Sequence, residues 1–237
     1  MQQKKFAVIT GGSSGIGLAA AMSLASDGYN IIICGRTSQK VLSASESISR
    51  TGALCFGFVA DLAEPGGVSQ LVLYTQSIFP RLDLLFNNAG TGQALDLERT
   101  TDEIWEQTIN TNLRATFQCC RDFLPMLRLG RDPLIINNAS VAAHRGFPQF
   151  AVYSASKGGI LSMSRSLREE LRPMGIRVST LSLGATDTDF WKDVEGEWDT
   201  ARMMKSNDVG KLISHVASLP PSAMLEELVL MPSGGAL

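Results

Sequence analysis

Short apolar runs alternate along the chain with longer amphipathic segments. The runs are rich in Leu, Phe and β-branched residues and cover residues 6–10, 30–34, 54–59, 82–86, 134–138, 177–183 and 227–230. A continuous apolar run of this length is typical of a strand that is covered on both faces of a sheet. The pattern therefore predicts about seven strands.

The segments between these runs carry helix signals. Helices are expected over residues 16–27, 102–129 and 151–172, with Gly28 as a stop for the first and Thr101 as a start for the second. Strands that alternate with helices form βαβ units, which place the strands in parallel and give right-handed crossovers. Since no linker or repeat divides the sequence, we expect one α/β domain over all 237 residues, a doubly wound parallel sheet with helices on both faces.

Charge and cysteine content narrow the function classes. The 21 Lys and Arg nearly balance the 23 Asp and Glu, and a formal charge of −2 excludes the bulk positive charge typical of non-specific nucleic-acid binders. The four cysteines show no CxxC pair and no Cys/His spacing, so we expect no metal site, no disulfides and a reducing compartment. No apolar stretch is long enough for a transmembrane helix, and the first run is too short for a signal peptide. We therefore expect a cytoplasmic protein that binds neither nucleic acid nor membranes.

The loop after the first strand carries the first chemical signal. It follows a strand and opens a helix, where glycines let the backbone approach a pyrophosphate and helix N-terminal amides face the anion. Its glycine spacing differs from the common Gly-x-Gly-x2-Gly fingerprint, which leaves a purely structural tight turn as the alternative. The strand–turn–helix context favours nucleotide binding, with contacts from Gly11, Ser13, Ser14, Gly15, Ile16 and Gly17.

The end of the second strand bears on the choice of dinucleotide. A dinucleotide fold that takes NAD usually has an acidic residue there, and one that takes NADP has an Arg. This chain has Arg36 and Thr37 and no carboxylate at that edge. The planar guanidinium of Arg36 suits a 2′-phosphate, and the alternative is a solvated Arg beside a Thr or Ser helix cap. The sequence favours NADP(H) over NAD(H).

Several motifs further along the chain complete a pattern. They are Asn87-Asn88-Ala89-Gly90 after the fourth strand, Asn112, Ser140 after the fifth strand, and Tyr153 followed four residues later by Lys157. Together with the glycine loop, and in this order, they resemble the short-chain dehydrogenase/reductase family from about residue 5 to residue 232. The resemblance implies a Rossmann-like fold and an oxidoreductase that transfers a hydride between nicotinamide and a carbonyl or alcohol.

The catalytic assignment rests on four residues. Tyr153 and Lys157 are four apart and share one face of a helix. A nearby ammonium favours the phenolate, so Tyr153 can act as general acid or base on the substrate oxygen. By resemblance, Lys157 also holds the nicotinamide ribose, Ser140 hydrogen-bonds the substrate oxygen, and Asn112 supports a proton-relay water. For Tyr153 and Lys157 taken alone, a half-exposed amphipathic pair is the alternative.

The resemblance assigns the remaining cofactor contacts. Asn88, Ala89 and Gly90 lie on the adenosine side, Asp61 and Leu62 beside the adenine, and Gly184, Thr186 and Thr188 near the nicotinamide. Asp61 also has capping-box spacing to Glu64, so a helix cap is its alternative role. Leu183 stands where the family usually has Pro, which predicts a less preorganised cofactor loop.

Substrate contacts are the least defined part of the prediction. Beside Ser140 and Tyr153, we expect Ala142, His144 and Trp191 to face the substrate, with Phe147, Phe150 and Phe190 nearby. Aromatic lining suits a hydrophobic or aromatic carbonyl compound, and ordinary core or lid packing is the alternative. By resemblance, a homodimer or homotetramer is expected. The primary prediction is an NADPH-dependent reductase; the alternatives are an NAD-dependent alcohol dehydrogenase and a non-catalytic dinucleotide-sensing protein.

Overall fold

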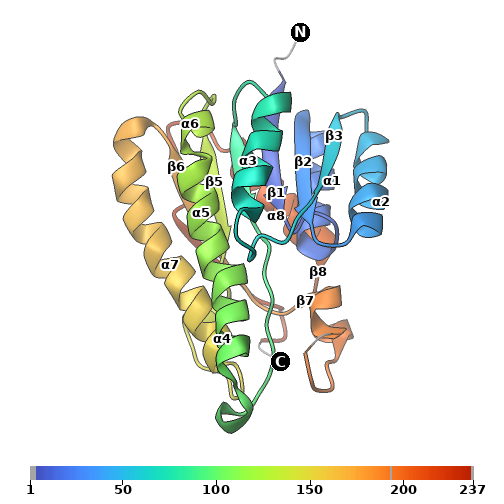
Figure 1. Cartoon of the computed structure of the whole chain (residues 1–237), viewed down its shortest axis with the longest axis vertical. Helices are drawn as coiled ribbons and strands as arrows, with labels where there is room; N and C mark the ends of the chain where they lie inside the picture. The colour runs from blue at the N-terminus through green and yellow to red at the C-terminus, as the bar shows by residue number, and fades with distance from the viewer. Residues whose placement is uncertain (1–3, 193, 236–237) are drawn as a thin grey trace.

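A seven-stranded parallel sheet forms the centre of the computed structural model, which describes residues 4–192 and 194–235 (Figure 1). The strand order is β3-β2-β1-β4-β5-β6-β9. The strands are β1 (Lys5–Thr10), β2 (Tyr29–Gly35), β3 (Cys55–Val59), β4 (Leu84–Asn87), β5 (Leu134–Asn138), β6 (Arg177–Leu183) and β9 (Glu227–Leu230). The predicted strands are confirmed, and β5, β6 and β9 begin and end at the predicted residues.

Helices cover both faces of this sheet. One apolar cluster joins the sheet to α1 (Gly15–Ser26), α2 (Ser38–Ser49) and α8 (Ser206–Ser218). A second cluster joins the other face to α3 (Gly67–Ile78), α5 (Ala115–Asp122), α6 (Leu124–Leu127) and the end of α7 (Ala151–Leu171). Side chains alternate between the faces along each strand; in β2, Ile31 and Ile33 join the first cluster and Ile32 joins the second. The predicted α/β class with helices on both faces is confirmed.

The helix predicted over residues 102–129 is broken into pieces. It begins with α4 (Asp102–Ile109), where the predicted start signal Thr101 accepts a hydrogen bond from the N–H of Ile104. A π-helical turn, Asn110–Arg114, separates α4 from α5. After α5, Phe123 interrupts the helix, and the short α6 begins at Leu124 with Pro125 in its first turn, where the missing N–H costs no helical hydrogen bond. The expectation of one continuous helix was wrong.

The secondary structure of the segment between β6 and α8, residues 184–192 and 194–205, was not predicted. It contains a small parallel pair, β7 (Thr186–Asp187) with β8 (Met204–Lys205), and two 3₁₀ turns, Asp189–Lys192 and Thr200–Arg202. Strands of two residues leave no hydrophobic period in the sequence. This β6–α8 segment lies at the carboxyl-end side of the sheet, in the lower part of Figure 1.

The strand order creates a switch point beside β1. The chain builds β1, β2 and β3 outward in one direction and then returns to place β4 on the other side of β1. In doubly wound sheets, ligands bind in the crevice outside the carboxyl ends of the strands at this point. Within the described ranges, no helix combines the length and apolar character needed to cross a bilayer.

Candidate active site

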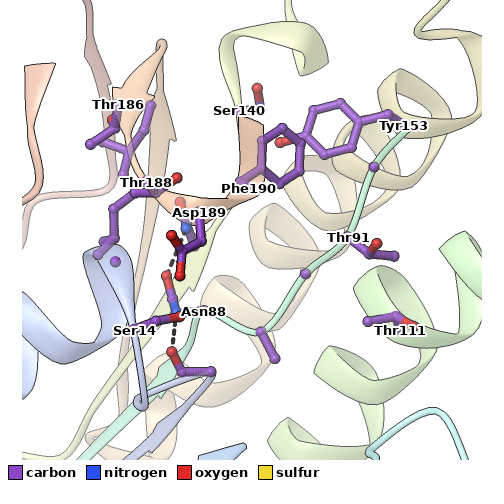
Figure 2. A pocket seen from close by; sticks show the side chains of 18 of the residues that line it. Ser14, Asn88, Thr91, Thr111, Ser140, Tyr153, Thr186, Thr188, Asp189 and Phe190 are labelled. Carbon is purple, nitrogen blue, oxygen red and sulfur yellow. Dashed lines mark hydrogen bonds between the residues drawn. The ribbon is translucent and has the colours of Figure 1, made fainter. Parts of the chain in front are cut away.

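A cavity of about 500 Å³ opens at the carboxyl edge of the sheet. It extends from the glycine loop after β1 to the β6–α8 segment, and Figure 2 shows Ser14 and Asn88 in one part and Ser140 and Tyr153 in another. Most of the residues predicted to form the site line it together: Gly11, Ser13, Ser14, Gly15, Ile16, Arg36, Thr37, Asp61, Leu62, Asn88, Ala89, Gly90, Ser140, Ala142, Tyr153, Lys157, Gly184, Thr186, Thr188 and Trp191. Among the described residues, the predicted Gly17, Asn112 and His144 do not line it.

The glycine loop has the backbone geometry of an anion cradle. Gly11 and Gly15 have φ of 64° and 51°, in the left-handed region that favours glycine. A Cβ at position 17 would clash with the carbonyl oxygen of Gly11. The start of α1 can therefore pack against the turn only because residue 17 is glycine. In the described structure, the Ser14 side chain makes no capping hydrogen bond to α1. The first N–H groups of α1 are therefore available to an anion in the cavity.

Asn88 ties the ends of three strands together beneath this loop. Its backbone N–H donates to Thr10 Oγ1 at 3.0 Å, and its Nδ2 donates to the carbonyl oxygens of Thr10 and Gly11 at 3.1 and 3.2 Å. Its Oδ1 accepts from Asn138 Nδ2 at 3.1 Å. Asn88 thus connects β1, β4 and β5 and holds the glycine turn in position.

Cationic side chains gather at the end of β2. Arg36 Nη1 lies 3.9 Å from Asp61 Oδ2, and both side chains are well exposed, so this pair is weak and leaves the guanidinium available. Thr37 precedes α2 without a side-chain capping hydrogen bond in the described chain. Lys40, in the first turn of α2, also lines the cavity and was missed, although a second cation four residues after Arg36 was a usable signal. The three side chains and the start of α2 form a group suited to a phosphate.

Asp61 does not serve as a helix cap. Its Oδ1 accepts a hydrogen bond from the backbone N–H of Ala63 at 2.9 Å, whereas α3 begins only at Gly67. The alternative role of Asp61, a capping box formed with Glu64, is therefore wrong. Asp61 keeps a local turn in shape and presents its second oxygen to the cavity side of Arg36.

Tyr153 and Lys157 project from α7 toward the end of β5. Lys157 Nζ donates to the carbonyl oxygen of Asn138 at 2.7 Å and lies 5.7 Å from the centre of the Tyr153 ring. Ser140 follows β5 directly, and its hydroxyl accepts from the Ala142 N–H at 3.1 Å. The Ser140 and Tyr153 side chains are hydrogen-bonded to each other, so both hydroxyls can meet a single substrate oxygen, and Lys157 lines the same cavity.

Burial shifts the pKa of both α7 groups toward their neutral forms. Burial raises the pKa of Tyr153 to about 12, and a hydrogen bond with the Ser140 side chain acts in the opposite direction. Burial lowers the pKa of Lys157 to about 8. The expectation that the Lys157 ammonium would determine the phenol pKa is wrong: desolvation has the largest effect on this pKa, and it acts in the opposite direction. At neutral pH Tyr153 carries a proton that it can donate to a carbonyl oxygen, and the resulting phenolate then needs a neighbouring cation to stabilise it.

Replacing Lys157 with Met should alter how stability depends on pH. The pKa of Lys157 is about 8 in the folded protein and 10.5 as its ordinary value, so the unfolded chain binds more protons between these values. The unfolding free energy of the wild type then rises with pH in that window, and Lys157→Met lacks this gain. The wild-type minus variant difference should increase by about 2 kcal/mol between pH 7 and pH 10. Urea unfolding across this range measures it, and a flat or falling difference would contradict the lowered pKa.

Asn112 is buried in the π-helical turn and supports the site through hydrogen bonds to other residues. Its Oδ1 accepts from the Thr91 N–H at 2.8 Å, and its Nδ2 donates to the Thr91 carbonyl at 2.8 Å and to Ser156 Oγ at 2.9 Å. The Ser156 hydroxyl donates in turn to the carbonyl oxygen of Tyr153 at 2.7 Å. Asn112 therefore connects the cavity wall to the first turn of α7. π-helical turns inside α-helices occur frequently at functional sites.

The structure places His144 against β6. Its Nε2 lies 2.8 Å from Ser182 Oγ, and in the described structure it contributes nothing to the cavity wall. The expected Ala142 and Trp191 do line the cavity, as do Phe147, Phe150 and Phe190. Trp198 also lines it and was missed, because it lies in an irregular stretch of the β6–α8 segment with no periodic signal.

Leu183, which replaces the Pro usual at this position, is held by packing. Its side chain is buried in the cluster that joins the sheet to α1, α2 and α8. The N–H of Gly184 donates to the carbonyl oxygen of Leu230 at 2.8 Å, and Thr186 Oγ1 donates to the Gly184 carbonyl at 3.1 Å. These contacts fix the start of the β6–α8 segment without a proline ring.

Known proteins resemble this chain in sequence and in fold. Residues 5–198 match the family described as short chain dehydrogenase. The 3-oxoacyl-(acyl-carrier-protein) reductase FabG of Staphylococcus aureus is 30% identical over 227 residues, 92% of each chain. The alcohol dehydrogenase of the archaeon Thermococcus sibiricus, solved with 5-hydroxy-NADP, has a TM-score of 0.90 at 26% identity and covers 98% of this chain and 97% of its own. The L-sorbose reductase of Gluconobacter frateurii, solved with NADPH and L-sorbose, has a TM-score of 0.89 at 27% identity and covers 99% and 97%.

Proposed function

The chain belongs to the short-chain dehydrogenase family, and from this premise we propose that it is an NADPH-dependent reductase of carbonyl compounds, reversible as an alcohol dehydrogenase. One observation carries the proposal. A buried tyrosine that keeps its proton at neutral pH, Tyr153, shares a cavity with a phosphate-type glycine loop and with Arg36. A group that donates a proton is what carbonyl reduction requires of the protein.

The residues present fit a nicotinamide dinucleotide phosphate. Asn138, which lines the cavity, has a buried Oδ1 with no hydrogen-bond partner among the described residues. Such an unpaired acceptor is costly unless a bound polar group reaches it. The residues that would hold the coenzyme are those of the glycine loop, Arg36, Thr37, Asp61, Leu62, Asn88, Ala89, Gly90, Lys157, Gly184, Thr186 and Thr188.

The chain's own residues account for the proton side of the reaction. When bound, the coenzyme supplies the hydride to the carbonyl carbon. Tyr153 donates its proton to the carbonyl oxygen, and the Ser140 hydroxyl hydrogen-bonds the same oxygen. The ammonium of Lys157 stabilises the phenolate that proton transfer leaves behind. Asn112, through Ser156, holds the first turn of α7 so that the phenol stays aligned.

The preference for NADPH over NADH rests on the edge of β2. Arg36 and Lys40 supply two cations there, and the described residues offer no carboxylate directly after the strand. The alcohol dehydrogenase and the L-sorbose reductase described above were solved with NADP-type coenzymes, which supports the same choice. An NAD-dependent alcohol dehydrogenase is the second candidate. A dinucleotide-sensing protein without catalysis is less favoured, because Ser140, Tyr153 and Lys157 all line the cavity.

NADPH oxidation against a panel of carbonyl compounds tests the proposal. The panel contains ketones, aldehydes, quinones, ketoses and β-ketoacyl thioesters, each measured with NADPH and with NADH. We expect turnover with NADPH on at least one class, and lower kcat/KM with NADH. Tight NADPH binding without turnover on any class would favour the sensing protein instead, and equal use of both coenzymes would favour the NAD-dependent alternative.

A further inference from the structure

A third apolar cluster lies apart from the two clusters that cover the sheet. It contains the buried Ala94, Phe150 and Val194, with five partly buried aromatic side chains packed against them. Its members come from the loop after β4, the segment before α7, α7 itself and the β6–α8 segment. Because the sheet faces are already covered by other clusters, this cluster is not required to bury the sheet. Its aromatic members line the cavity: Phe147, Phe150, Tyr153, Phe190, Trp191 and Trp198.

Five of these rings form a closed series of contacts. The centroids of Phe150 and Tyr153 are 5.9 Å apart, and those of Tyr153 and Phe190 are 5.8 Å apart. Phe190 contacts Trp191 at 5.4 Å, Trp191 contacts Trp198 at 4.6 Å, and Trp198 returns to Phe150 at 6.3 Å. Figure 2 shows Phe190 beside the Tyr153 ring and near Ser140. The proton donor Tyr153 is therefore itself one member of the aromatic wall.

Apart from the Tyr153 hydroxyl, the polar side-chain atoms of this wall are already used within the protein. Trp191 Nε1 donates to the Thr186 carbonyl at 2.9 Å, and Trp198 Nε1 donates to the Val194 carbonyl at 3.1 Å. The indoles consequently offer the cavity their apolar surfaces. Phe147 and Phe150 bring no polar atom, and Phe190 extends the same apolar surface beside the proton donor.

Most charged side chains that line the described cavity have partners within the protein or lie at its other end, beside β2. Lys157 donates to the Asn138 carbonyl at 2.7 Å. Asp189 pairs with Lys40 at 3.1 Å and with Lys192 at 2.7 Å. Arg36 and Asp61 face each other at the end of β2. At the aromatic end of the described cavity, the cation of the lining is Lys157, whose Nζ is hydrogen-bonded to the Asn138 carbonyl, and Arg145 lies outside the lining with its guanidinium 5.2 Å from the centre of the Phe147 ring.

We propose that the substrate of this site is a neutral aromatic carbonyl compound, an aryl ketone or aryl aldehyde. This inference rests on the proposed reductase function and narrows its substrate class. A flat aromatic ring gains edge-to-face and offset contacts with the wall, and only its carbonyl oxygen needs polar partners, which Ser140 and Tyr153 supply. A ketose would bury several hydroxyls without partners, and a β-ketoacyl thioester of coenzyme A would place the amide groups of its long polar arm against an apolar aromatic wall.

Four probes test this substrate class with NADPH: acetophenone, cyclohexyl methyl ketone, fructose and acetoacetyl-CoA. Contacts with one or two rings of the wall are worth about tenfold in affinity, so acetophenone should exceed its saturated analogue about tenfold in kcat/KM, through KM. Fructose and acetoacetyl-CoA should fall roughly a hundredfold or more below acetophenone, because each leaves several polar groups unpaired. A preference for either of these two probes would overturn the inference.

Substitutions in the aromatic wall distinguish its contribution to the kcat/KM ratio from the intrinsic reactivity of the two ketones. Trp198→Leu keeps an apolar side chain and should bring the acetophenone to cyclohexyl methyl ketone ratio close to one. Phe190→Leu should act in the same direction and serves if Trp198→Leu does not fold. The matched control is Trp105→Leu on the exposed surface of α4, which should leave the ratio unchanged. An unchanged ratio in folded Trp198→Leu and Phe190→Leu would overturn the role of the wall.

A binding measurement distinguishes failure of this inference from failure of the reductase function. Acetophenone and cyclohexyl methyl ketone are titrated into the protein with NADPH, and tryptophan fluorescence reports binding. If no probe turns over but acetophenone binds about tenfold more tightly, the reductase function fails and the aromatic site stands. If both ketones bind equally, the aromatic site fails whether or not turnover occurs.

Discussion

Replacing Tyr153 with Phe should lower kcat for NADPH-dependent carbonyl reduction by about a thousandfold, within the range that a positioned proton donor contributes. The substitution removes one hydroxyl and keeps the ring, so the contacts with Phe150 and Phe190 and the burial around them remain. Because burial raises the pKa of Tyr153 to about 12, the wild-type residue holds its proton throughout the physiological range. Steady-state NADPH oxidation measures the loss of turnover, and a fluorescence titration measures NADPH binding, which should stay close to wild type.

The matched control for this change is Tyr74→Phe. Tyr74 lies on α3, where its ring packs against Phe58 with centroids 4.8 Å apart, on the far side of the sheet from α1 and α8. Tyr74→Phe removes the same hydroxyl oxygen and should keep normal turnover. Wild-type turnover by Tyr153→Phe would remove Tyr153 as the proton donor. An equal loss of NADPH binding and turnover would instead assign the hydroxyl to the coenzyme site.

The fold was predictable where local pattern and burial agree. The strands are continuous apolar runs covered on both faces, and the alternation of Ile31, Ile32 and Ile33 between two clusters shows why such a run carries no polar positions. The range 102–129 was not predictable as three helices, because the π-helical turn depends on contacts far away in the sequence. Asn112 in that turn bonds Thr91 and Ser156, and neither partner is visible from the helix sequence itself.

Site residues were predictable where a local sequence motif defines them. They were less predictable where the packing of distant segments determines their position or pKa. The glycine loop needs Gly11 and Gly15 at positive φ, which is a property of the chain's own backbone. The pKa direction of Tyr153 depends instead on the burial that the surrounding segments create, and the four-residue spacing to Lys157 gave the opposite sign. Trp198 reaches the cavity through the fold of an irregular segment, so spacing alone offered no signal.

Changing Arg36 to Asp should weaken NADPH binding by about a hundredfold while leaving NADH binding unchanged or slightly tighter. Hydrogen bonds to a charged group contribute about 1.5–3 kcal/mol, which is roughly 10- to 150-fold in affinity. The new carboxylate also repels the 2′-phosphate, whereas it can accept from the ribose hydroxyl of NADH. Arg36 is exposed and its contact with Asp61 is long, so the fold should tolerate the change. Fluorescence titrations with both coenzymes give the ratio of dissociation constants.

Two comparisons make that ratio specific to the phosphate. Arg50→Asp makes the same charge change at the other end of α2, where the Arg50 side chain bonds only Ser47 among the described residues, and should leave both affinities unchanged. Lys40→Met should weaken NADPH by a smaller factor, because Lys40 already divides its charge with Asp189. If Arg36→Asp weakens NADPH and NADH equally, then Arg36 acts on a part that the two coenzymes share, and the 2′-phosphate assignment fails. If NADPH is weakened alone, the cation at the end of β2 determines the coenzyme.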